Sequence, residues 1–394
     1  MNQIRKRRVF YVSGFDPRGV AAYHRMYSEE SQKQAALSGV SVQVGQRKRE
    51  GALASTWRVE RTVDGGTVET TFEFMHWDDI TRGHWHAGYA RLYGLAVKTY
   101  WYWIVSSDFL AKVFRISGWN FVTGIAPAVA LFVLPALALL AGWAGYYFVQ
   151  SASPETGWLP ALSGAAGFAV VIGLGYWLDR KLSLGWLLRT YAFVLEYSRG
   201  KVPKLEERMD RFAERIVRYV EAADDDEILV VGHSLGANVA VSALARALAI
   251  NPLLFRQYRP VGLLTLGGSI PLQGMLPWAR LFREELAQLA ANGDLAWVDI
   301  TAPQDIASFA LLNPVTVSGV GMDEKAPQRP QVVSARFREL LSPETYDAAT
   351  WNVFRMHFQY LMASEREAVH DYLSVTTDAL GFRNRFAESQ NGPE

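Results

Sequence analysis

The residues best suited to chemistry form one short motif, Gly232-His233-Ser234-Leu235-Gly236. A short apolar run at 228–231 precedes it, and a helix-forming stretch at 238–250 follows it. A serine flanked by glycines between a strand and a helix predicts a sharp turn, because small residues let the backbone fold tightly without clashes. Such a turn exposes the hydroxyl beside the positive end of the helix dipole. The motif therefore predicts a nucleophilic serine, with an ordinary glycine-rich turn as the alternative.

This motif and its setting resemble the α/β-hydrolase superfamily, in particular lipase- and esterase-like members that carry Gly-His-Ser-Leu-Gly-Ala at the turn. The resemblance implies an α/β fold of the hydrolase type, with a mostly parallel sheet, helices on both faces and Ser234 as nucleophile. It also implies an oxyanion hole that uses the backbone N–H of Leu235 and a second donor after an early strand. Ser13-Gly14-Phe15 ends such a strand, so Gly14 and Phe15 are the expected donors, with a plain tight turn as the alternative. Ser13 stands where histidine is common in the family.

A serine hydroxyl needs a general base, and the superfamily order places an acid and then a histidine after the serine. Only His357 and His370 follow Ser234 at a useful distance. His357 comes after the last predicted strand, where this fold normally carries the base. His370 lies in a polar, helix-like stretch and is interpreted as a surface residue. We therefore expect His357 to be the base.

The acid should follow a late strand, and four aspartates are available there. Asp305 comes after the predicted strand 295–300, in a proline-containing loop that can deliver a carboxylate to the histidine. Asp299 falls within that strand, and Asp294 and Asp323 are weaker alternatives. Each aspartate could instead cap a helix or form a turn. We expect Asp305 to complete the triad with Ser234 and His357.

The remaining composition indicates neither a cofactor nor nucleic acid. The 394 residues include 40 Lys and Arg against 39 Asp and Glu, a net charge of +1, and no cysteine. The charge balance gives no field that favours nucleic acid, and the absence of cysteine excludes disulfides and thiolate sites. No glycine-rich phosphate-binding motif is present. The cluster His76, Asp78, Asp79, His84 and His86 matches no known ligand spacing, so we expect no metal and interpret the cluster as local packing.

The apolar residues are concentrated in two uncharged stretches, 117–150 and 156–178. Each is longer than the roughly 20 residues that a spanning helix requires, and aromatic residues lie towards their ends. These stretches predict a transmembrane hairpin with helices near 118–150 and 157–178; two buried core helices are the alternative. The link between them has no Lys or Arg, whereas the outer flanks carry Lys112, Arg115, Arg180 and Lys181, which favours a cytoplasmic location for both flanks. The aromatic stretch 92–110 is interpreted as an interfacial or buried helix, not a third span.

Elements that position the motif alternate along the rest of the chain. We expect strands at 8–13, 40–44, 56–62, 67–75, 228–231, 261–266, 295–300 and 331–337, helices at 19–37, 204–221 and 238–250, and a hairpin turn at Asp64-Gly65-Gly66. Strands alternating with helices predict a parallel sheet. The hydrolase domain then comprises residues 1–91 and 200–394, and residues 92–199 form a membrane-associated insertion.

These expectations describe an integral membrane protein of a bacterial inner membrane, with two spans and a cytoplasmic hydrolase domain. Its partner would be the lipid bilayer, and its substrate a carboxylic ester, favoured as a lipid or acyl-chain ester by proximity to the membrane. The alternatives are a tethered esterase or thioesterase for soluble substrates and a non-catalytic scaffold with this fold. The sequence leaves acyl and alcohol specificity and oligomeric state open.

Overall fold

The computed structural model describes residues 3–63, 66–85, 88–153, 155, 157–321, 329–366 and 371–387. The chain forms two compact units, the first comprising Met1–Trp85, Val194–Thr350 and Arg355–Glu394, and the second His86–Phe193 and Trp351–Phe354. The boundaries at 85/86 and 193/194 lie close to the expected 91/92 and 199/200. The sequence did not indicate that Trp351–Phe354 belongs to the second unit. There, Phe354 packs edge-on against Trp186, with ring centroids 5.7 Å apart.

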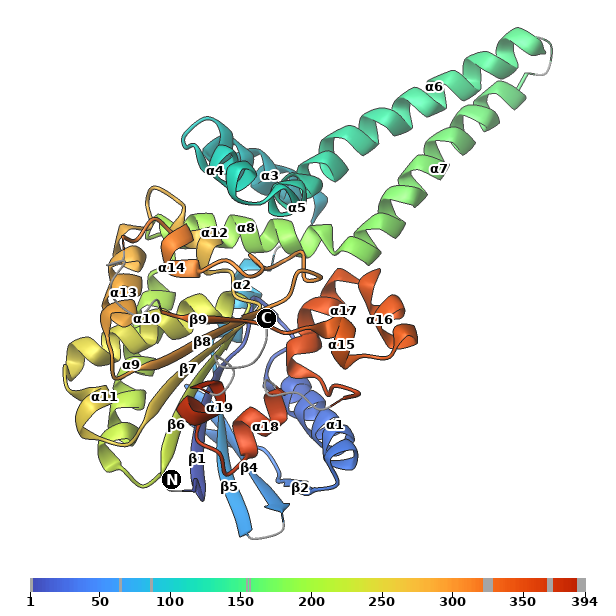
Figure 1. The fold of residues 1–394 in the computed structure, drawn as a ribbon. Helices are drawn as coiled ribbons and strands as arrows, with labels where there is room; N and C mark the ends of the chain where they lie inside the picture. The colour runs from blue at the N-terminus through green and yellow to red at the C-terminus, as the bar shows by residue number, and fades with distance from the viewer. Residues whose placement is uncertain are drawn as a thin grey trace. The chain divides into compact units, whose positions relative to one another are not determined.

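A mostly parallel sheet forms the centre of the first unit, as expected (Figure 1). In the described residues its order is β2-β4-β5-β1-β6-β7-β8-β9, with β3 paired to β4. All pairings from β5 through β1 to β9 are parallel, and those of β4 with β2, β3 and β5 are antiparallel. The strands are β1 (Lys6–Val12), β2 (Ser41–Val44), β3 (Lys48–Glu50), β4 (Ala54–Val63), β5 (Gly66–Met75), β6 (Glu227–His233), β7 (Val261–Leu266), β8 (Ala296–Thr301) and β9 (Gln331–Ser334).

Burial explains why the central strands read as continuous apolar runs. Every residue of β6 and β7 is buried, because helices cover both faces of a parallel sheet. The edge strand β2 instead alternates between exposed and half-buried residues. The expected hairpin joins β4 to β5, with Val63 opposite Gly66; Asp64 and Gly65 lie outside the described residues. The last strand ends at Ser334, earlier than expected, and Phe337 begins a short helix.

Helices flank the sheet of the first unit on both faces (Figure 1). The helix that follows Ser234 is α10 (Leu235–Ile250), and it packs against α9 (Pro203–Ala222), α13 (Arg280–Ala291) and β6. The other helices are α1 (Val20–Ser38), α2 (Asp78–His84), α11 (Leu254–Gln257), α12 (Ile270–Gly274), α14 (Pro314–Val317), α15 (Phe337–Leu340), α16 (Pro343–Thr350), α17 (Val353–Phe358), η2 (Gln359–Leu361), α18 (Tyr372–Thr377) and α19 (Phe382–Ala387); α8 (Leu184–Ser198) runs across the unit boundary.

The second unit carries a long helical hairpin. Its first arm, Gly118–Ala152, consists of α5 (Gly118–Ala128), the π-helical turn η1 (Val129–Val133) and α6 (Leu134–Ala152). Its second arm is α7 (Leu159–Leu182). The π-helical turn lies between Pro127 and Pro135, each of which removes a backbone donor and disturbs regular helical bonding. Both arms are long and apolar enough to cross a membrane. The most apolar part of α7 contains no buried residue.

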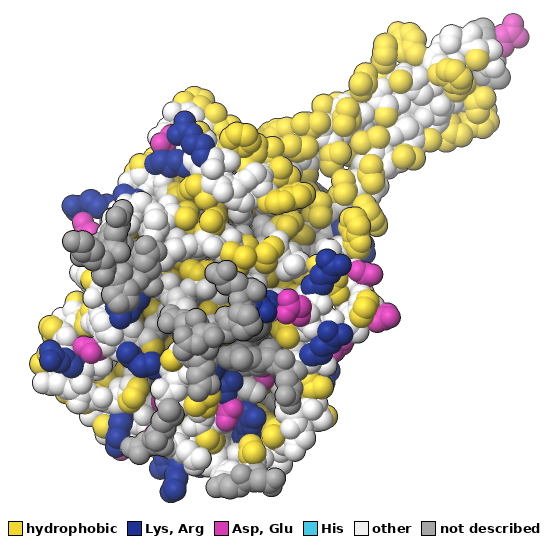
Figure 2. Space-filling view, in the orientation of Figure 1, with side chains coloured by type: hydrophobic (Ala, Val, Ile, Leu, Met, Phe, Trp, Pro, Cys, Tyr) yellow, Lys and Arg dark blue, Asp and Glu magenta, His cyan; other side chains and the backbone are white. Residues whose placement is uncertain are grey.

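Glycines let the two arms approach closely. A Cβ on Gly142 would lie 3.1 Å from the carbonyl oxygen of Gly164, and one on Gly164 would lie 2.9 Å from that of Gly142. Further along, a Cβ on Gly145 would lie 2.9 Å from the carbonyl oxygen of Ser163. Small residues at such contacts are typical of helix pairs that associate within lipid. Figure 2 shows hydrophobic side chains over the outer surface of both arms.

The aromatic stretch 92–110 is helical but not continuous. The helix α3 (Tyr89–Ile104) ends before Asp108, and α4 (Phe109–Ile116) starts after it. One face of α3 is buried through Ala96, Tyr100 and Trp103, while Val97 and Trp101 are exposed. One face of the helix is therefore part of the core of its unit, and another face is an exposed apolar surface.

Candidate active site

The serine of the motif occupies the sharp turn that the sequence predicts. Ser234 has φ 57° and ψ −127°, a conformation that non-glycine residues rarely adopt, between the end of β6 and the start of α10. Its N–H donates to the carbonyl of Leu266 at the end of β7, 2.9 Å away. Backbone strain of this kind persists only where the surrounding structure enforces it. Here the neighbouring strand and helix hold the serine at the carboxyl end of the sheet.

Both glycines of the motif are required by close backbone contacts. A Cβ on Gly232 would lie 2.5 Å from the Cα of Ala237, and one on Gly236 would lie 2.2 Å from the carbonyl oxygen of Val12. Neither obstacle is a flexible side chain, so neither can move aside without moving the backbone. The first turn of α10 therefore packs directly on the end of β1, and the tight turn depends on both glycines.

The structure brings His357 and Asp305 together as a buried pair. The His357 Nδ1 lies 2.8 Å from the Asp305 Oδ2, and both side chains are fully buried. Because a carboxylate only accepts hydrogen bonds, Nδ1 carries the proton and donates it to Asp305. In the neutral imidazole the basic lone pair is then on Nε2, the tautomer that a general base needs. The loop after β8 delivers the aspartate and α17 delivers the histidine.

Two further donors hold the Asp305 carboxylate. The Tyr360 hydroxyl donates to Oδ2 over 3.1 Å, and the backbone N–H of Ala307 donates to Oδ1 over 3.1 Å. Burial, followed by the charge of Asp305, raises the pKa of Tyr360 well above its usual value, so the phenol remains a donor. Together these contacts fix the orientation of the carboxylate oxygen that meets His357.

His233 links the serine turn to the histidine. Its ring lies beside that of His357, with centroids 4.8 Å apart, and its Nε2 lies 2.9 Å from the His357 carbonyl oxygen. Burial and the nearby His357 lower the pKa of His233 well below its usual value, so His233 is neutral. A carbonyl only accepts, so Nε2 carries the proton and donates. The residue directly before Ser234 therefore holds the backbone of His357 next to the turn.

The other aspartates that the sequence offered have different surroundings. Asp299 lies within β8 at 2% exposure and accepts a hydrogen bond from the Thr265 hydroxyl. Burial raises the pKa of Asp299 to about 7, although that bond opposes the shift. Asp294 is exposed at the opposite end of β8. Asp323 and the alternative base His370 lie outside the described residues. Within the described chain, Asp305 is the aspartate that contacts His357.

The loop after β1 lies against the serine, as expected for a donor loop. A Cβ on Gly14 would come within 2.9 Å of the Ser234 Cβ and 3.3 Å of its Oγ. Phe15 is buried next to it. Leu235 opens α10, where the first N–H groups of a helix have no partner within the helix. Of the expected donors, Gly14 therefore lies close to the Ser234 hydroxyl, and Phe15 and Leu235 are the next residues in the chain after Gly14 and Ser234.

The histidine and aspartate cluster after β5 is engaged in local contacts. His76 contacts Ser55 and Asp78, and Asp79 forms a two-point ion pair with Arg208. The His84 Nδ1 donates to a backbone carbonyl of its own helix. His86 lies outside the described residues. In the described chain, no group of three or more metal-binding side chains is placed to hold an ion.

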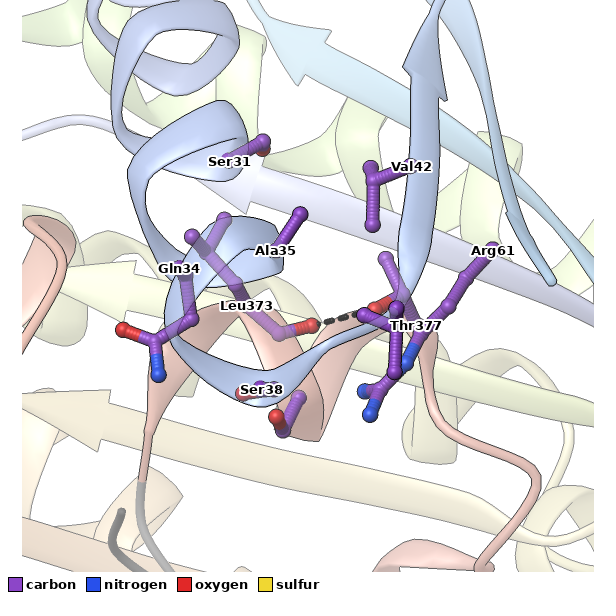
Figure 3. Close-up of a pocket in the computed structure, with 10 residues that line it drawn as sticks. Ser31, Gln34, Ala35, Ser38, Val42, Arg61, Leu373 and Thr377 are labelled. Carbon is purple, nitrogen blue, oxygen red and sulfur yellow. Dashed lines mark hydrogen bonds between the residues drawn. The ribbon is translucent and has the colours of Figure 1, made fainter. Parts of the chain in front are cut away.

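A small crevice elsewhere in the first unit does not offer a substrate site. Figure 3 shows Gln34 and Ala35 of α1 facing Leu373 and Thr377 of α18, where the Thr377 hydroxyl donates to the Leu373 carbonyl over 2.6 Å. The cavity measures about 10 Å³. Such a volume accommodates about one water molecule. An organic substrate would not fit there.

Two contributors to the site escaped the sequence analysis. Tyr360 is three residues after His357, close enough to reach the same carboxylate from the next turn, and this spacing was the available signal. The contact of His233 with His357 joins residues 124 positions apart, so nothing local could have indicated it.

Comparison with known proteins gives no match of any kind. No protein-family model matches the chain, and no curated protein and no solved structure is significantly similar to it. The interpretation of the site therefore depends on its own residues and geometry.

Proposed function

We propose that the chain is a membrane-anchored serine hydrolase with an α/β-hydrolase-type fold that cleaves carboxylic esters. The observation that carries this proposal is a buried His357–Asp305 pair that packs against His233, the residue directly before a serine in the strained turn between β6 and α10. A strained backbone and a buried, bonded histidine–aspartate pair both cost stability. Features with such a cost are concentrated at functional sites. The mostly parallel sheet and the order serine, aspartate, histidine along the chain support the same assignment.

The proposed reaction is acyl transfer in two steps. The Ser234 Oγ attacks the ester carbonyl while His357 Nε2 takes its proton, and Asp305 stabilises the imidazolium that results. The tetrahedral oxyanion is held by the N–H of Leu235 and by that of Gly14 or Phe15. The intermediate collapses as the alkoxide leaves with the proton from His357, which produces an acyl-enzyme. Water, deprotonated by His357, then releases the carboxylic acid and restores Ser234.

The deciding experiment is labelling of the full chain in membranes by a fluorophosphonate, which phosphonylates activated serines. We expect the wild type to label and Ser234→Ala to lose labelling. The matched control is Ser55→Ala, because Ser55 also contacts a histidine that contacts an aspartate. That control should label like the wild type. A wild-type protein that fails to label in both detergent and membranes would leave only the scaffold alternative.

We propose that the hairpin spans the membrane twice. The arms contain 35 and 24 residues, and the shorter arm extends about 36 Å at 1.5 Å per residue, more than the ~30 Å hydrocarbon core. Basic residues on the outer flanks favour a cytoplasmic first unit. Because the chain has no cysteine, single substitutions report the topology directly. In intact cells an impermeant maleimide should modify Ser153→Cys in the link, and Ser41→Cys only after permeabilisation. The reverse pattern would overturn the orientation.

A lipid or acyl-chain ester is the proposed substrate class, favoured by the membrane location. Hydrolysis of p-nitrophenyl esters of increasing chain length, below and above their critical micelle concentration, tests this class. We expect kcat/KM to rise with chain length and with micelle formation. Equal or falling values would favour a tethered esterase or thioesterase for soluble substrates.

A further inference from the structure

We propose that Trp77 is a positioning residue for the oxyanion hole, and that it acts through the loop after β1, residues 13–19. This inference rests on the proposed hydrolase function and assigns a role to a residue outside the triad. The Trp77 indole Nε1 donates to the carbonyl oxygen of Ser13 over 2.9 Å, and the side chain is fully buried. The loop that this bond holds includes Gly14, which lies against Ser234.

Peptide geometry links this hydrogen bond to the orientation of the Gly14 N–H in the proposed oxyanion hole. The Ser13 C=O and the Gly14 N–H belong to one planar trans peptide and point in opposite directions. A donor that fixes the carbonyl therefore fixes the N–H as well. The next peptide is fixed within the loop itself, since the Asp16 N–H donates to the Gly14 carbonyl over 2.8 Å. The direction of the first peptide thus depends on Trp77, while the second follows from the loop.

The segment that carries Trp77 is anchored on several sides. Phe15 packs against Trp77 and Trp85, with ring centroids 6.5 and 5.7 Å away. One guanidinium nitrogen of Arg82 donates to the Pro17 carbonyl over 3.3 Å and also to Asp78. The segment 77–85, which comprises α2 and the two tryptophans that flank it, therefore contacts the loop at Ser13, Phe15 and Pro17. We call this segment the support.

The Asp78 carboxylate of this support stays ionised in the working range of pH. Burial alone would raise the pKa of Asp78, but hydrogen bonds from His76 and Arg82 lower it to about 2. The Ser55 Oγ lies 2.9 Å from the His76 Nε2, so the order serine, histidine, aspartate recurs here. Ser55, however, is buried within the extended strand β4 and does not occupy a strained turn between a strand and a helix. Within the described chain, Arg82 contacts the loop directly, and Asp78 holds Arg82 in place.

The test compares Trp77→Phe with Trp57→Phe in the full chain. Both tryptophans are buried, and both substitutions remove an indole N–H and keep an aromatic ring. The Trp57 indole stacks on Phe72, 4.4 Å between centroids, and its Nε1 has no hydrogen-bond partner in the part of the chain that the structure describes. Trp57→Phe controls for the loss of ring volume and of an indole N–H, so a loss of labelling in Trp77→Phe alone points to the bond with Ser13.

The readouts are the fluorophosphonate labelling rate, KM for a soluble ester, and the inhibition constant of a trifluoromethyl ketone, whose adduct carries an oxyanion. Deleting an oxyanion donor costs about 10²–10³ in rate, so misorienting one should cost about tenfold or more. We expect this loss in Trp77→Phe for labelling and for ketone affinity, with KM little changed. Trp57→Phe should resemble the wild type.

The outcomes distinguish a failure of the positioning role from a failure of the hydrolase proposal. If the wild type labels and Trp77→Phe matches Trp57→Phe, the positioning role is wrong while the hydrolase proposal stands. If the wild type does not label, the hydrolase proposal itself fails. If Trp77→Phe does not fold, Arg82→Gln replaces it, because Arg82 is half exposed and contacts the same loop. A loss of ketone affinity without a change in KM would then support the role, and unchanged affinity would overturn it.

Discussion

Replacement of Asp305 by asparagine tests the core of the proposed mechanism. The asparagine side chain has the same shape but presents one acceptor and one donor group. Because the Ala307 N–H donates to Oδ1, the acceptor of the new amide stays there and its NH₂ takes the place of Oδ2. That position faces the His357 Nδ1, 2.8 Å away. The NH₂ group would donate to Nδ1, so the imidazole proton moves to Nε2, where it blocks proton transfer from Ser234.

The size of the effect follows from two losses. The wrong tautomer and the missing negative charge next to the imidazolium together cost about 10⁴-fold in kcat, as in other Ser–His–Asp sites. At 1.36 kcal/mol per factor of ten, this corresponds to about 5.5 kcal/mol of transition-state stabilisation. The Tyr360 hydroxyl loses its acceptor as well, which lowers stability but leaves the tautomer argument unchanged.

The assay is ester hydrolysis and fluorophosphonate labelling of Asp305→Asn and Asp299→Asn, with circular dichroism to verify folding. The two aspartates are equally buried and undergo the same chemical change, but Asp299 contacts Thr265 and not the histidine. We expect the rate of Asp299→Asn to stay within about threefold of the wild type, since its partner Thr265 lies outside the proposed triad. Retention of more than a tenth of wild-type activity in folded Asp305→Asn would refute the reasoning, as would an equal loss in both variants.

Three further predictions concern the stability of the same region, measured as free energy of unfolding in detergent. Gly236→Ala should destabilise the protein by more than about 2 kcal/mol, because its Cβ would overlap the Val12 carbonyl. The control Gly83→Ala, which has open space around it, should not destabilise the protein. Equal effects of the two substitutions would contradict the packing argument. His233→Leu leaves the His357 carbonyl without its donor and should cost about 1–3 kcal/mol more than His233→Gln, which can still donate; equal stabilities would refute the role of that bond. The pKa of Asp299 is raised from 3.8 to about 7, so its ionisation destabilises the folded state. The wild type should therefore lose about 4 kcal/mol of stability as pH rises from about 4 to about 7, while Asp299→Asn should not. Parallel pH profiles of the two proteins would contradict a buried, protonated Asp299.

Local patterns were sufficient for eight of the nine strands in the described residues, for the helices α1, α9 and α10, and for the position of the serine. Continuous apolar runs predicted β6 and β7, and the glycines around Ser234 predicted a turn whose contacts tolerate no Cβ. Two long uncharged stretches predicted the helical hairpin. These features depend on periodicity, length and steric freedom, which neighbouring residues carry by themselves.

Only the tertiary structure decided which distant groups meet. The sequence offered four aspartates and two histidines, and the contact with His357 is made by Asp305 in the loop after β8, whereas Asp299 within the strand contacts Thr265. The contacts of His233 with His357 and of Trp77 with Ser13 join segments 124 and 64 residues apart. A hydrogen bond depends on distances of a few tenths of an ångström, and such distances are set by how the loops at the carboxyl end of the sheet fold over one another. Residue types therefore determined the chemistry available to this protein, and packing of those loops determined which residues are placed to perform it.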